Sequence, residues 1–337
     1  MYPGHPPSMK IEGVVPIFKI KIMDDLWLHE EFIGIRKERN MVNVSVVFMA
    51  AGLGTRFGGD KQLAKLGPKG ESLMAYGAYD AIALGAEKLI FVLRKEMEEV
   101  FWETLGRRLE KKIPVEVVFQ ELEPLPQGIS VPKERVKPWG TGHCLYVARE
   151  NLGEAFLILN ADDYYGKAVL AGLFQALQEG ETFVMPGYLV KNTLSKEGPV
   201  SRGVITLGEE DQVLSITERE KIYEKDQTVF YESRNGLEVL PENTYVSMNI
   251  FAGRRDALGS LEKIFQDFFK QNLEELTKKE FYLPHAMEAL AKASGKPMRM
   301  IEAKGPWMGV TYKEDAQRVR EKLQALVQAG RYPVDLF

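Results

Sequence analysis

The chain has 337 residues, of which 45% are hydrophobic and 27% charged, and its 44 basic and 48 acidic residues leave a net charge of −4. This composition is ordinary for a globular protein and excludes a surface built to coat nucleic acid. The single cysteine, Cys144, excludes an intramolecular disulfide, the four histidines form no zinc-binding pattern, and no apolar run approaches the ~20 residues that span a bilayer. We therefore expect a cytoplasmic protein without a nucleic-acid or membrane partner, and the sequence indicates no particular oligomeric state.

The first 40 residues differ in character from the rest of the chain. Residues 1–8 are rich in proline and glycine, and Met41 stands directly before a strongly apolar stretch. We expect residues 1–40 to be an extension, either disordered or upstream of the true translation start, with a regulatory or dimerising arm as the alternative. Residues 41–337 are expected to form one large domain.

Strand and helix patterns alternate between residues 41 and 180. Apolar strands are predicted at residues 43–51, 88–94, 115–120 and 155–161. Helices are predicted at residues 72–85, 97–111, 142–152 and 167–180. This order predicts an α/β fold with a parallel sheet between helices, and ligands on such sheets bind beyond the carboxyl ends of the strands.

The second half of the chain is less regular. Strands are predicted at residues 182–190, 202–208, 212–218, 244–253 and 298–303, and helices at residues 260–280 and 313–330. These strands predict a mixed or antiparallel extension that lies over the site.

The most informative segment is VVFMAAGLGTRFGGDKQLAKLGPKG, residues 46–70, in which a strand runs into a loop rich in glycine and basic residues. Loops of this kind are typical of phosphate binding. A Walker loop is excluded because Asp60 occupies the position of its lysine. A dinucleotide fingerprint is weakened because the spacing of Gly52, Gly54 and Gly58 is one residue too long and the next strand ends in basic residues. An NADP enzyme could use an arginine there, so this alternative stays open.

The segment AAGLGTRFGGDKQL resembles the N-terminal signature of the sugar nucleotidyltransferases, also called NDP-sugar pyrophosphorylases, which is (A/G)-G-x-G-T-R-(L/F) followed by a lysine. The chemistry agrees, because backbone N–H groups bind triphosphate oxygens and basic side chains neutralise the departing pyrophosphate. The resemblance implies two catalytic residues: Arg56 would grip the leaving β- and γ-phosphates, and Lys61 would reach the reacting phosphates. It implies a single domain around a mostly parallel, mixed Rossmann-like sheet flanked by helices, of the glycosyltransferase A type. The nucleotide-binding residues that it implies in the loop are Ala51, Gly52, Gly54 and Thr55.

The segment PWGTGH, residues 138–143, resembles the part of the same family that reads the nucleotide base. The resemblance implies base contacts from Gln120, at the end of the preceding strand, and from Gly140 and Thr141. An amide offers both a donor and an acceptor, which suits a pyrimidine. The G-T-G-H form is most similar to uridylyltransferases that act on N-acetylglucosamine phosphate, which favours UTP. His143 fits a helix-start residue as well as it fits a ligand contact.

The segment LILNADDYYG resembles the family's magnesium-binding strand end, and Asp162 matches the metal aspartate. Mg²⁺ prefers carboxylate and phosphate oxygens and keeps several waters, so one or two aspartates suffice. Asp163 fits a metal ligand and a turn-closing residue equally well. Many family members carry a second metal aspartate in W-x-D, where this chain has Gly309. The second ligand is then missing or comes from elsewhere, with Asn249 and Asp315 as candidates.

Weaker resemblances point to the acceptor substrate. The strand SRGVITL resembles the family's Y-G-V strand, which would place Gly203 under a sugar ring. In SITERE, Glu218 would accept hydrogen bonds from sugar hydroxyls and Arg219 would hold the phosphate. In VSMNIFAG, Ser247 falls on the family's asparagine and Asn249 on its glycine.

Together these motifs predict a Mg²⁺-dependent nucleotidyltransferase of nucleotide-sugar biosynthesis, which joins an NTP to a sugar-1-phosphate or a similar small phosphate and releases pyrophosphate. One alternative is a glycosyltransferase of the same fold, which would want a D-x-D motif and no G-x-G-T-R loop, whereas this chain shows the reverse. The other alternative is a non-catalytic nucleotide or sugar-phosphate sensor, motivated by Gly309.

Overall fold

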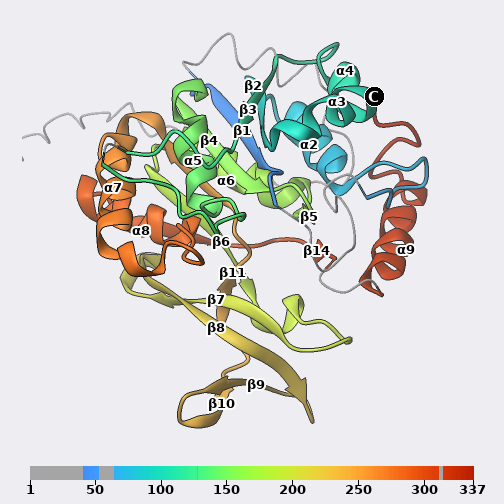
Figure 1. The fold of residues 1–337 in the computed structure, drawn as a ribbon. Helices are drawn as coiled ribbons and strands as arrows, with labels where there is room; N and C mark the ends of the chain where they lie inside the picture. Colours follow the sequence, from blue (N-terminus) through green and yellow to red (C-terminus); the bar gives the residue numbers. More distant parts are fainter. Residues whose placement is uncertain (1–40, 53–63, 127, 311–313) are drawn as a thin grey trace, which may run out of the picture. The chain divides into compact units, whose positions relative to one another are not determined.

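The computed structural model describes residues 41–52, 64–126, 128–310 and 314–337 (Figure 1). The predictions for Gly54, Thr55, Arg56 and Lys61, and those for residues 1–40, lie outside these residues. In the described ranges no helix is both long enough and apolar enough to cross a membrane.

Four parallel strands form one end of the sheet, and they are the parallel strands that the sequence predicted. Their order is β3-β2-β1-β4, and each of these neighbours pairs in parallel. The bounds of these strands are β1 Val44–Met49, β2 Lys88–Leu93, β3 Val115–Phe119 and β4 Ala155–Asn160. Every residue of β1 is buried, which is the pattern of a central strand covered on both faces.

Helices cover both faces of this core. Because successive side chains of a strand point to opposite faces, Val46 and Phe48 of β1 pack in one cluster while Val47 and Met49 pack in another. The first cluster includes residues of α2 (Leu73–Ala83), α6 (Lys167–Gln178) and α9 (Asp315–Gln328). The second includes residues of α5 (Thr141–Ala148), α7 (Leu261–Gln271) and α8 (Leu283–Ser294). The connection from β2 to β3 contains α3 (Glu98–Phe101) and α4 (Arg107–Leu109), joined by one π-helical turn.

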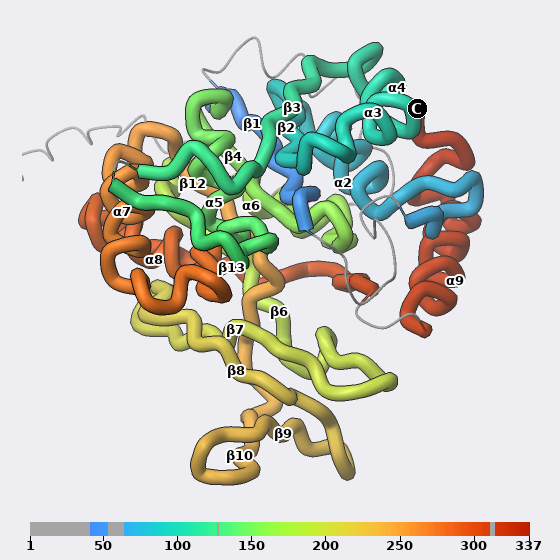
Figure 2. Tube along the Cα trace, in the orientation of Figure 1, coloured from blue at the N-terminus to red at the C-terminus, as the bar shows by residue number. Residues whose placement is uncertain are grey.

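The remaining strands extend the sheet beyond β4, mostly in antiparallel pairs, to twelve strands in the order β10-β9-β8-β7-β11-β6-β12-β4-β1-β2-β3, with β13 beside β6. Their bounds are β6 Phe183–Leu189, β7 Val200–Leu207, β8 Val213–Lys225, β9 Thr228–Ser233, β10 Gly236–Leu240, β11 Tyr245–Ser247, β12 Phe251–Arg254 and β13 Met298–Glu302. Figure 2 shows β8, β9 and β10 projecting from the helix-covered part of the sheet. The fold is therefore α/β, with a mixed sheet that is parallel at its core.

The strand predicted at residues 244–253 is broken in two. β11 pairs with β6 and β7, whereas β12 pairs with β6 and β4, so the strand changes one neighbour between its two halves. Asn249 lies in the break and has a positive φ of 58°. Asparagine tolerates this left-handed conformation better than most residues, which explains how the chain can turn there.

One helix was predicted with the wrong extent, and other elements were missed. The helix predicted at residues 260–280 ends at Gln271, and α8, which was not predicted, begins after it. The signals of α8 are present in the sequence as a proline in its first turn and as Gly295, whose φ of 66° closes the helix. A small two-stranded sheet of β5 (Asp163–Tyr164) and β14 (Met308–Gly309) was also not predicted.

Candidate functional site

The start of the glycine-rich loop and the acidic pair lie at adjacent strand ends. Met49 at the end of β1 is in register with Asn160 at the end of β4, and the N–H of Ala161 donates to the Met49 carbonyl at 3.2 Å. Ala51 is buried behind this edge, and Gly52 is exposed. The loop therefore leaves the sheet beside Asp162, as expected for neighbouring parallel strands.

The two aspartates after β4 have different surroundings. Asp162 is half-buried, whereas Asp163 is buried. An oxygen of Asp163, Oδ2, accepts from Nδ2 of Asn160 at 2.8 Å and lies 3.3 Å from the hydroxyl of Tyr165. That hydroxyl also lies 2.8 Å from the Met248 carbonyl, and burial raises the pKa of Tyr165 well above its ordinary value, so that it is a neutral donor. Asp163 is thus held by the protein, and Asp162 is the more accessible carboxylate.

Asn160 connects the acidic pair to the broken strand. Nδ2 of Asn249 donates to Oδ1 of Asn160 at 2.7 Å, and the N–H of Asn249 donates to the Ser247 hydroxyl at 3.2 Å. The structure therefore brings Asn249 to the end of β4, next to the acids. Asn160 itself was not predicted as a site residue, although its position as the polar last residue of an apolar strand is a usable signal.

The predicted acceptor residues are only partly brought together. Gly203 on β7 is in register with Ser247 on one side and with Glu218 on the other, so these residues continue the row from Asn249 across the sheet. Burial raises the pKa of Glu218, and the charge of Arg202 opposes that shift. The guanidinium of Arg219 instead lies over the Tyr231 ring, 4.9 Å from its centroid, on the β8–β9 part of the sheet.

The predicted base-binding residues do lie together. Gln120 follows β3 and is buried, and its Nε2 donates to the Gly140 carbonyl at 2.7 Å. Gly140 has a φ of 99°, and a Cβ atom there would lie 2.7 Å from the Phe281 carbonyl oxygen, so only glycine fits. The hydroxyl of Thr141 accepts from the N–H of Leu283 at 3.0 Å. One donor of the Gln120 amide is therefore already used, and its Oε1 has no hydrogen-bond partner among the described residues.

The proline-rich segment between Gln120 and Gly140 is fixed by a buried arginine. Arg135 donates to the carbonyls of Leu276 at 2.5 Å, Lys279 at 2.9 Å and Pro138 at 2.7 Å, and its guanidinium lies 3.7 Å from the centroid of the Trp139 ring. The segment therefore packs as part of the domain and positions the turn before Gly140.

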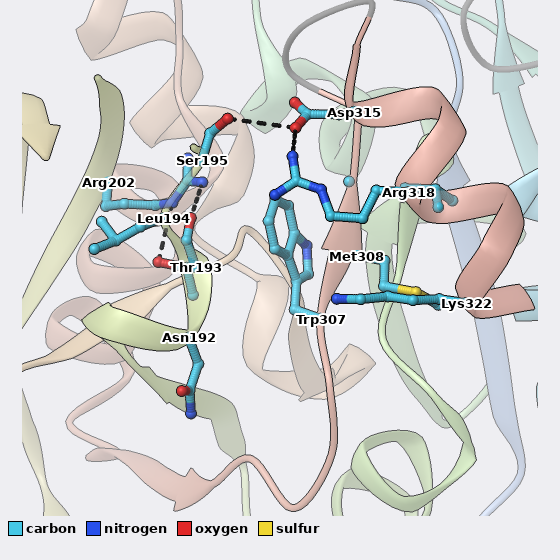
Figure 3. A pocket seen from close by; sticks show the side chains of 12 residues that line it. Asn192, Thr193, Leu194, Ser195, Arg202, Trp307, Met308, Asp315, Arg318 and Lys322 are labelled. Carbon is cyan, nitrogen blue, oxygen red and sulfur yellow. Dashed lines mark hydrogen bonds and ion pairs between the residues drawn. The ribbon is translucent and has the colours of Figure 1, made fainter. Parts of the chain in front are cut away.

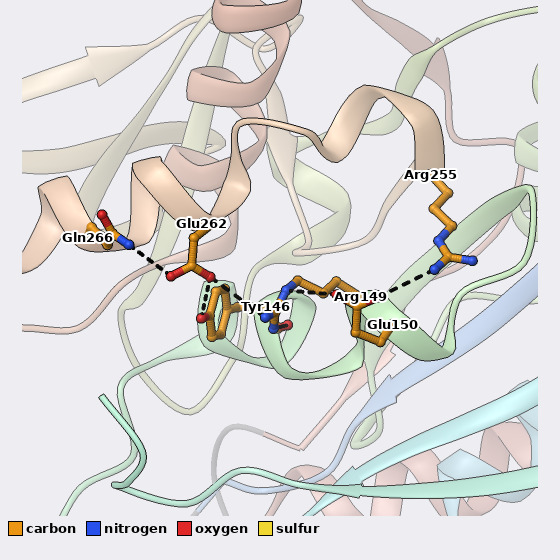
Figure 4. A network of polar contacts seen from close by, with 6 residues as sticks. All are labelled: Tyr146, Arg149, Glu150, Arg255, Glu262 and Gln266. Atoms are coloured by element: carbon orange, nitrogen blue, oxygen red, sulfur yellow. Dashed lines mark hydrogen bonds and ion pairs between the residues drawn. The ribbon is translucent and has the colours of Figure 1, made fainter. Parts of the chain in front are cut away.

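A polar network holds the helix that begins at Thr141 against α7 (Figure 4). Glu262 accepts from the Tyr146 hydroxyl at 2.5 Å and from Gln266 at 3.0 Å, and it pairs with Arg149 at 3.7 Å. A second pair at 3.5 Å joins Arg255 to Glu150. These contacts fix the orientation of α5 and, with it, the position of the turn at Gly140.

His143 lies in the protein interior. Its ring stacks on Phe265 with centroids 5.0 Å apart and an interplanar angle of 10°, and it also stacks on Tyr146. Burial, with smaller contributions from the charges of Arg135 and Arg149, lowers the pKa of His143 to about 3. His143 is thus a neutral ring in an aromatic cluster.

The glycine that replaces the family's second aspartate faces the acidic pair. Gly309 of β14 is in register with Asp163 of β5, and a Cβ atom at position 309 would lie 2.3 Å from the Trp307 ring and 2.5 Å from Oδ1 of Asp163. Of the other candidates, Asn249 bonds to Asn160, whereas Asp315 accepts from the Ser195 hydroxyl at 3.3 Å and pairs with Arg318.

The residues present suit a magnesium ion that is bound mostly through substrate. No group of three or more His, Cys, Asp or Glu side chains in the described parts of the chain could hold a metal. Mg²⁺ does not require such a group, because one or two carboxylates with phosphate oxygens and waters complete its shell. Asp162, half-buried at the strand end, fits that donor set.

Comparison with known proteins gives a consistent assignment of the fold. A family model described as nucleotidyl transferase matches residues 45–308. A solved structure assigned as a glucose-1-phosphate thymidylyltransferase from Bacillus anthracis is similar, with a TM-score of 0.58, 12% identity, and coverage of 83% of this chain and 95% of that chain. The inositol-1-phosphate CTP transferase from T. maritima is similar with a TM-score of 0.53, 13% identity, and coverage of 84% of this chain and 96% of that chain. A search of curated proteins finds no match.

Proposed function

Because the chain belongs to the nucleotidyl transferase family, we propose that it joins an NTP to a sugar-1-phosphate or a similar small phosphorylated acceptor and releases pyrophosphate. The observation that carries the proposal is the convergence of three groups on one edge of the sheet. These groups are the loop start at Ala51 and Gly52, the accessible carboxylate of Asp162, and the row from Asn160 through Asn249 to Gly203.

In this reaction an oxygen of the acceptor phosphate attacks the α-phosphorus of the NTP in line. The new P–O bond forms as the bond from the α-phosphorus to the bridging oxygen breaks, and pyrophosphate leaves with the electron pair. A phosphate monoester is already anionic near neutral pH, so the step needs no general base. The task of the protein is to position the two substrates and to neutralise charge.

Each described residue then has a definite task. The backbone of Ala51 and Gly52 begins the loop that would cradle the triphosphate, and Gln120 with Gly140 and Thr141 would contact the base. Asp162 would hold Mg²⁺, which when bound neutralises negative charge on the nucleotide phosphates. The Gln120 amide retains a carbonyl acceptor and one donor hydrogen, which suits a pyrimidine. We propose UTP as the preferred nucleotide because the G-T-G-H segment is most similar to that of uridylyltransferases.

The proposal is tested by measuring pyrophosphate release with Mg²⁺, each NTP in turn, and a panel of sugar-1-phosphates and other phosphorylated alcohols. We expect turnover with at least one pair, and we expect Asp162→Asn to reduce it about 100-fold or more, which is the scale expected when one charge-stabilising group is lost. Asp256→Asn, an exposed aspartate after β12, is the matched control and should leave turnover unchanged.

The base assignment has its own test. Gln120→Ala should reduce the preference for UTP over CTP and the purine nucleotides, measured as ratios of kcat/KM. NTP binding without turnover on any acceptor would contradict the proposed enzyme and favour the nucleotide sensor. An unchanged base preference in Gln120→Ala would contradict only the role of Gln120.

A further inference from the structure

A pocket lies beside the acidic pair, between the turn after β6, the strand β14 and the first two turns of α9 (Figure 3). We call it the α9 pocket and define it by six of its lining residues, which are Ser195, Arg202, Trp307, Asp315, Arg318 and Lys322. None of these residues was predicted from the sequence to bind a ligand, although Asp315 was considered for the metal.

The α9 pocket carries more positive than negative charge. Three cationic side chains and one carboxylate line it, and Arg318 pairs with that carboxylate, Asp315. Lys322 is exposed and forms no ion pair within the described residues. Figure 3 shows the Lys322 side chain pointing toward the Trp307 ring. After the Arg318–Asp315 pair is set aside, Arg202 and Lys322 remain as two cations.

Arg202 is the more informative of the two. Its guanidinium donates to the Thr193 carbonyl at 2.5 Å, to the Thr193 hydroxyl at 3.3 Å and to the Ser201 carbonyl at 2.7 Å, and all three acceptors are neutral. Burial lowers the pKa of Arg202, and the charges of Asp163, Glu218 and Asp315 oppose this shift from a distance. Arg202 is half-buried and its hydrogen-bond acceptors among the described residues are all neutral, so an anion in the pocket would be stabilised.

The aromatic wall of the pocket also presents a donor. The Arg202 guanidinium lies 5.1 Å from the centroid of a Trp307 ring, and Nε1 of Trp307 is buried without a hydrogen-bond partner among the described residues. Guanidinium, ammonium and indole N–H groups all donate, so the pocket is suited to a ligand rich in acceptor oxygens. A phosphate group has this chemistry, and the planar guanidinium matches its geometry.

The pocket adjoins the acceptor side of the candidate site. Gly309 forms part of its wall and faces Asp163 across the small sheet, and the charge of Glu218, which is in register with Gly203, acts on Arg202. The base-binding residue Gln120 lies at the far strand of the sheet order, beyond β1 and β2.

We propose that the α9 pocket binds the phosphate group of the acceptor, a small phosphate monoester, through Arg202, Arg318 and Lys322. This inference rests on the proposed function. It assigns to these residues the binding of the acceptor phosphate, which the family resemblance assigned to Arg219.

The first experiment measures binding without any NTP. Inorganic phosphate and glucose 1-phosphate are titrated into the full chain, and binding is measured by calorimetry. The change in tryptophan fluorescence on binding is also measured and is compared between the wild type and Trp307→Phe. We expect Lys322→Gln and Arg318→Lys each to weaken binding about tenfold, as expected for the loss of one charged hydrogen bond. Arg320→Gln removes the same charge from the same helix at an exposed position outside the pocket, and it should bind as the wild type does.

The second experiment measures kinetics with the best NTP and acceptor pair. We expect Lys322→Gln to raise KM for the acceptor about tenfold while KM for the NTP changes less than twofold. A rise in KM for the NTP, or weaker inhibition by pyrophosphate with an unchanged acceptor KM, would place the nucleotide or the leaving group in the pocket and overturn the proposal.

The two experiments separate this inference from the proposed function. If no pair releases pyrophosphate but phosphate binding depends on Lys322, the proposed function fails and the pocket remains an anion site without the acceptor role. If pyrophosphate is released but phosphate binds the wild type and Lys322→Gln equally, or binds neither, the proposed function stands and the pocket inference fails.

Discussion

Gly309 and Asp163 face each other across the β5–β14 sheet, so closely that a Cβ atom at position 309 would lie 2.5 Å from Oδ1 of Asp163. The residue that departs from the family's W-x-D pattern is thus the one that gives space to a carboxylate of this chain. The absence of an aspartate at position 309 and the burial of an aspartate at position 163 are two aspects of one packing arrangement.

This contact predicts that a side chain at position 309 is destabilising. Gly309→Ala should lower the free energy of unfolding by roughly 1–3 kcal/mol, because the methyl group overlaps the Trp307 ring and the Asp163 carboxylate. Gly309→Asp should cost more, because it also places two carboxylates together. Urea denaturation measures both effects. Gly259→Ala is the control, because a Cβ atom at Gly259 meets nothing within 4 Å, and equal stabilities of Gly309→Ala and Gly259→Ala would contradict the prediction.

The two aspartates after β4 should separate activity from stability. Asp163→Ala leaves the Asn160 amide without its acceptor in a buried network and should cost roughly 1–3 kcal/mol of unfolding free energy. Asp162→Ala, at a half-buried position, should cost less stability and abolish pyrophosphate release. Denaturant titrations measure the unfolding free energy of each variant, and pyrophosphate release is measured on the same preparations. The reverse order of effects would transfer the metal role to Asp163.

A buried carboxyl on α2 should control how the stability changes between acidic and neutral pH. Asp80 on α2 is 1% exposed, accepts from the Tyr332 hydroxyl at 2.8 Å, and has its pKa raised to about 7, mainly by burial. The folded state therefore holds a proton that the unfolded state loses near pH 4, and the unfolding free energy falls by about 4 kcal/mol as pH rises from 4 through 7. Asp80→Asn should remove this loss, measured as the unfolding free energy at pH 5 and pH 8. If the unfolding free energy of Asp80→Asn depended on pH as that of the wild type does, the role of Asp80 would be contradicted.

His143 should have the opposite effect on the unfolding free energy in nearly the same pH range. Its pKa in the folded protein is lowered to about 3, so the unfolded state binds a proton below about pH 6.5 that the folded state refuses. The contribution of His143 to stability is therefore present at neutral pH and is lost as pH falls. His143→Phe preserves the stack on Phe265 and should flatten the acid limb without lowering pyrophosphate release. A large loss of turnover in a folded His143→Phe protein would show that the ring contacts a ligand.

The two titrations oppose each other between about pH 4 and pH 6.5, so the wild-type profile should be flatter there than that of either variant. Asp80→Asn should reveal the loss of stability toward acidic pH that is due to His143, and His143→Phe should reveal the loss of stability from about pH 4 to about pH 7 that is due to Asp80. Profiles of the double variant provide the control, because both slopes should then be absent.

Local patterns predicted the parallel core well because its strands are mostly apolar and its helices alternate with them. The helix predicted at residues 260–280 was too long because its amphipathic pattern continues past Asn272, which ends α7 in the structure. The α8 helix begins beyond these residues and was missed. The break at Asn249 could not be predicted, because its cause is tertiary: β11 and β12 need different neighbours.

The positions of candidate site residues were predictable where a motif follows a strand, as for Asp162 and Gln120, or begins a helix, as for Gly140 and Thr141. They were not predictable where partners come from distant segments. The Asn160 side chain bonds to that of Asn249, which is 89 positions away in the sequence. Arg202 lines a pocket together with Trp307 and residues of α9, which are also distant in the sequence. Arg219 shows the converse, because a matching motif does not fix where a long side chain packs.

The broken strand has a mechanical consequence for the whole domain. Because β11 pairs with β7 and β12 pairs with β4, while both pair with β6, the three residues between them carry the chain from one part of the sheet to the other. The bond from Asn249 to Asn160 lies at this joint. A substitution at Asn249 would therefore affect the end of β4 that carries the acids and the β11 segment that pairs with Gly203 together.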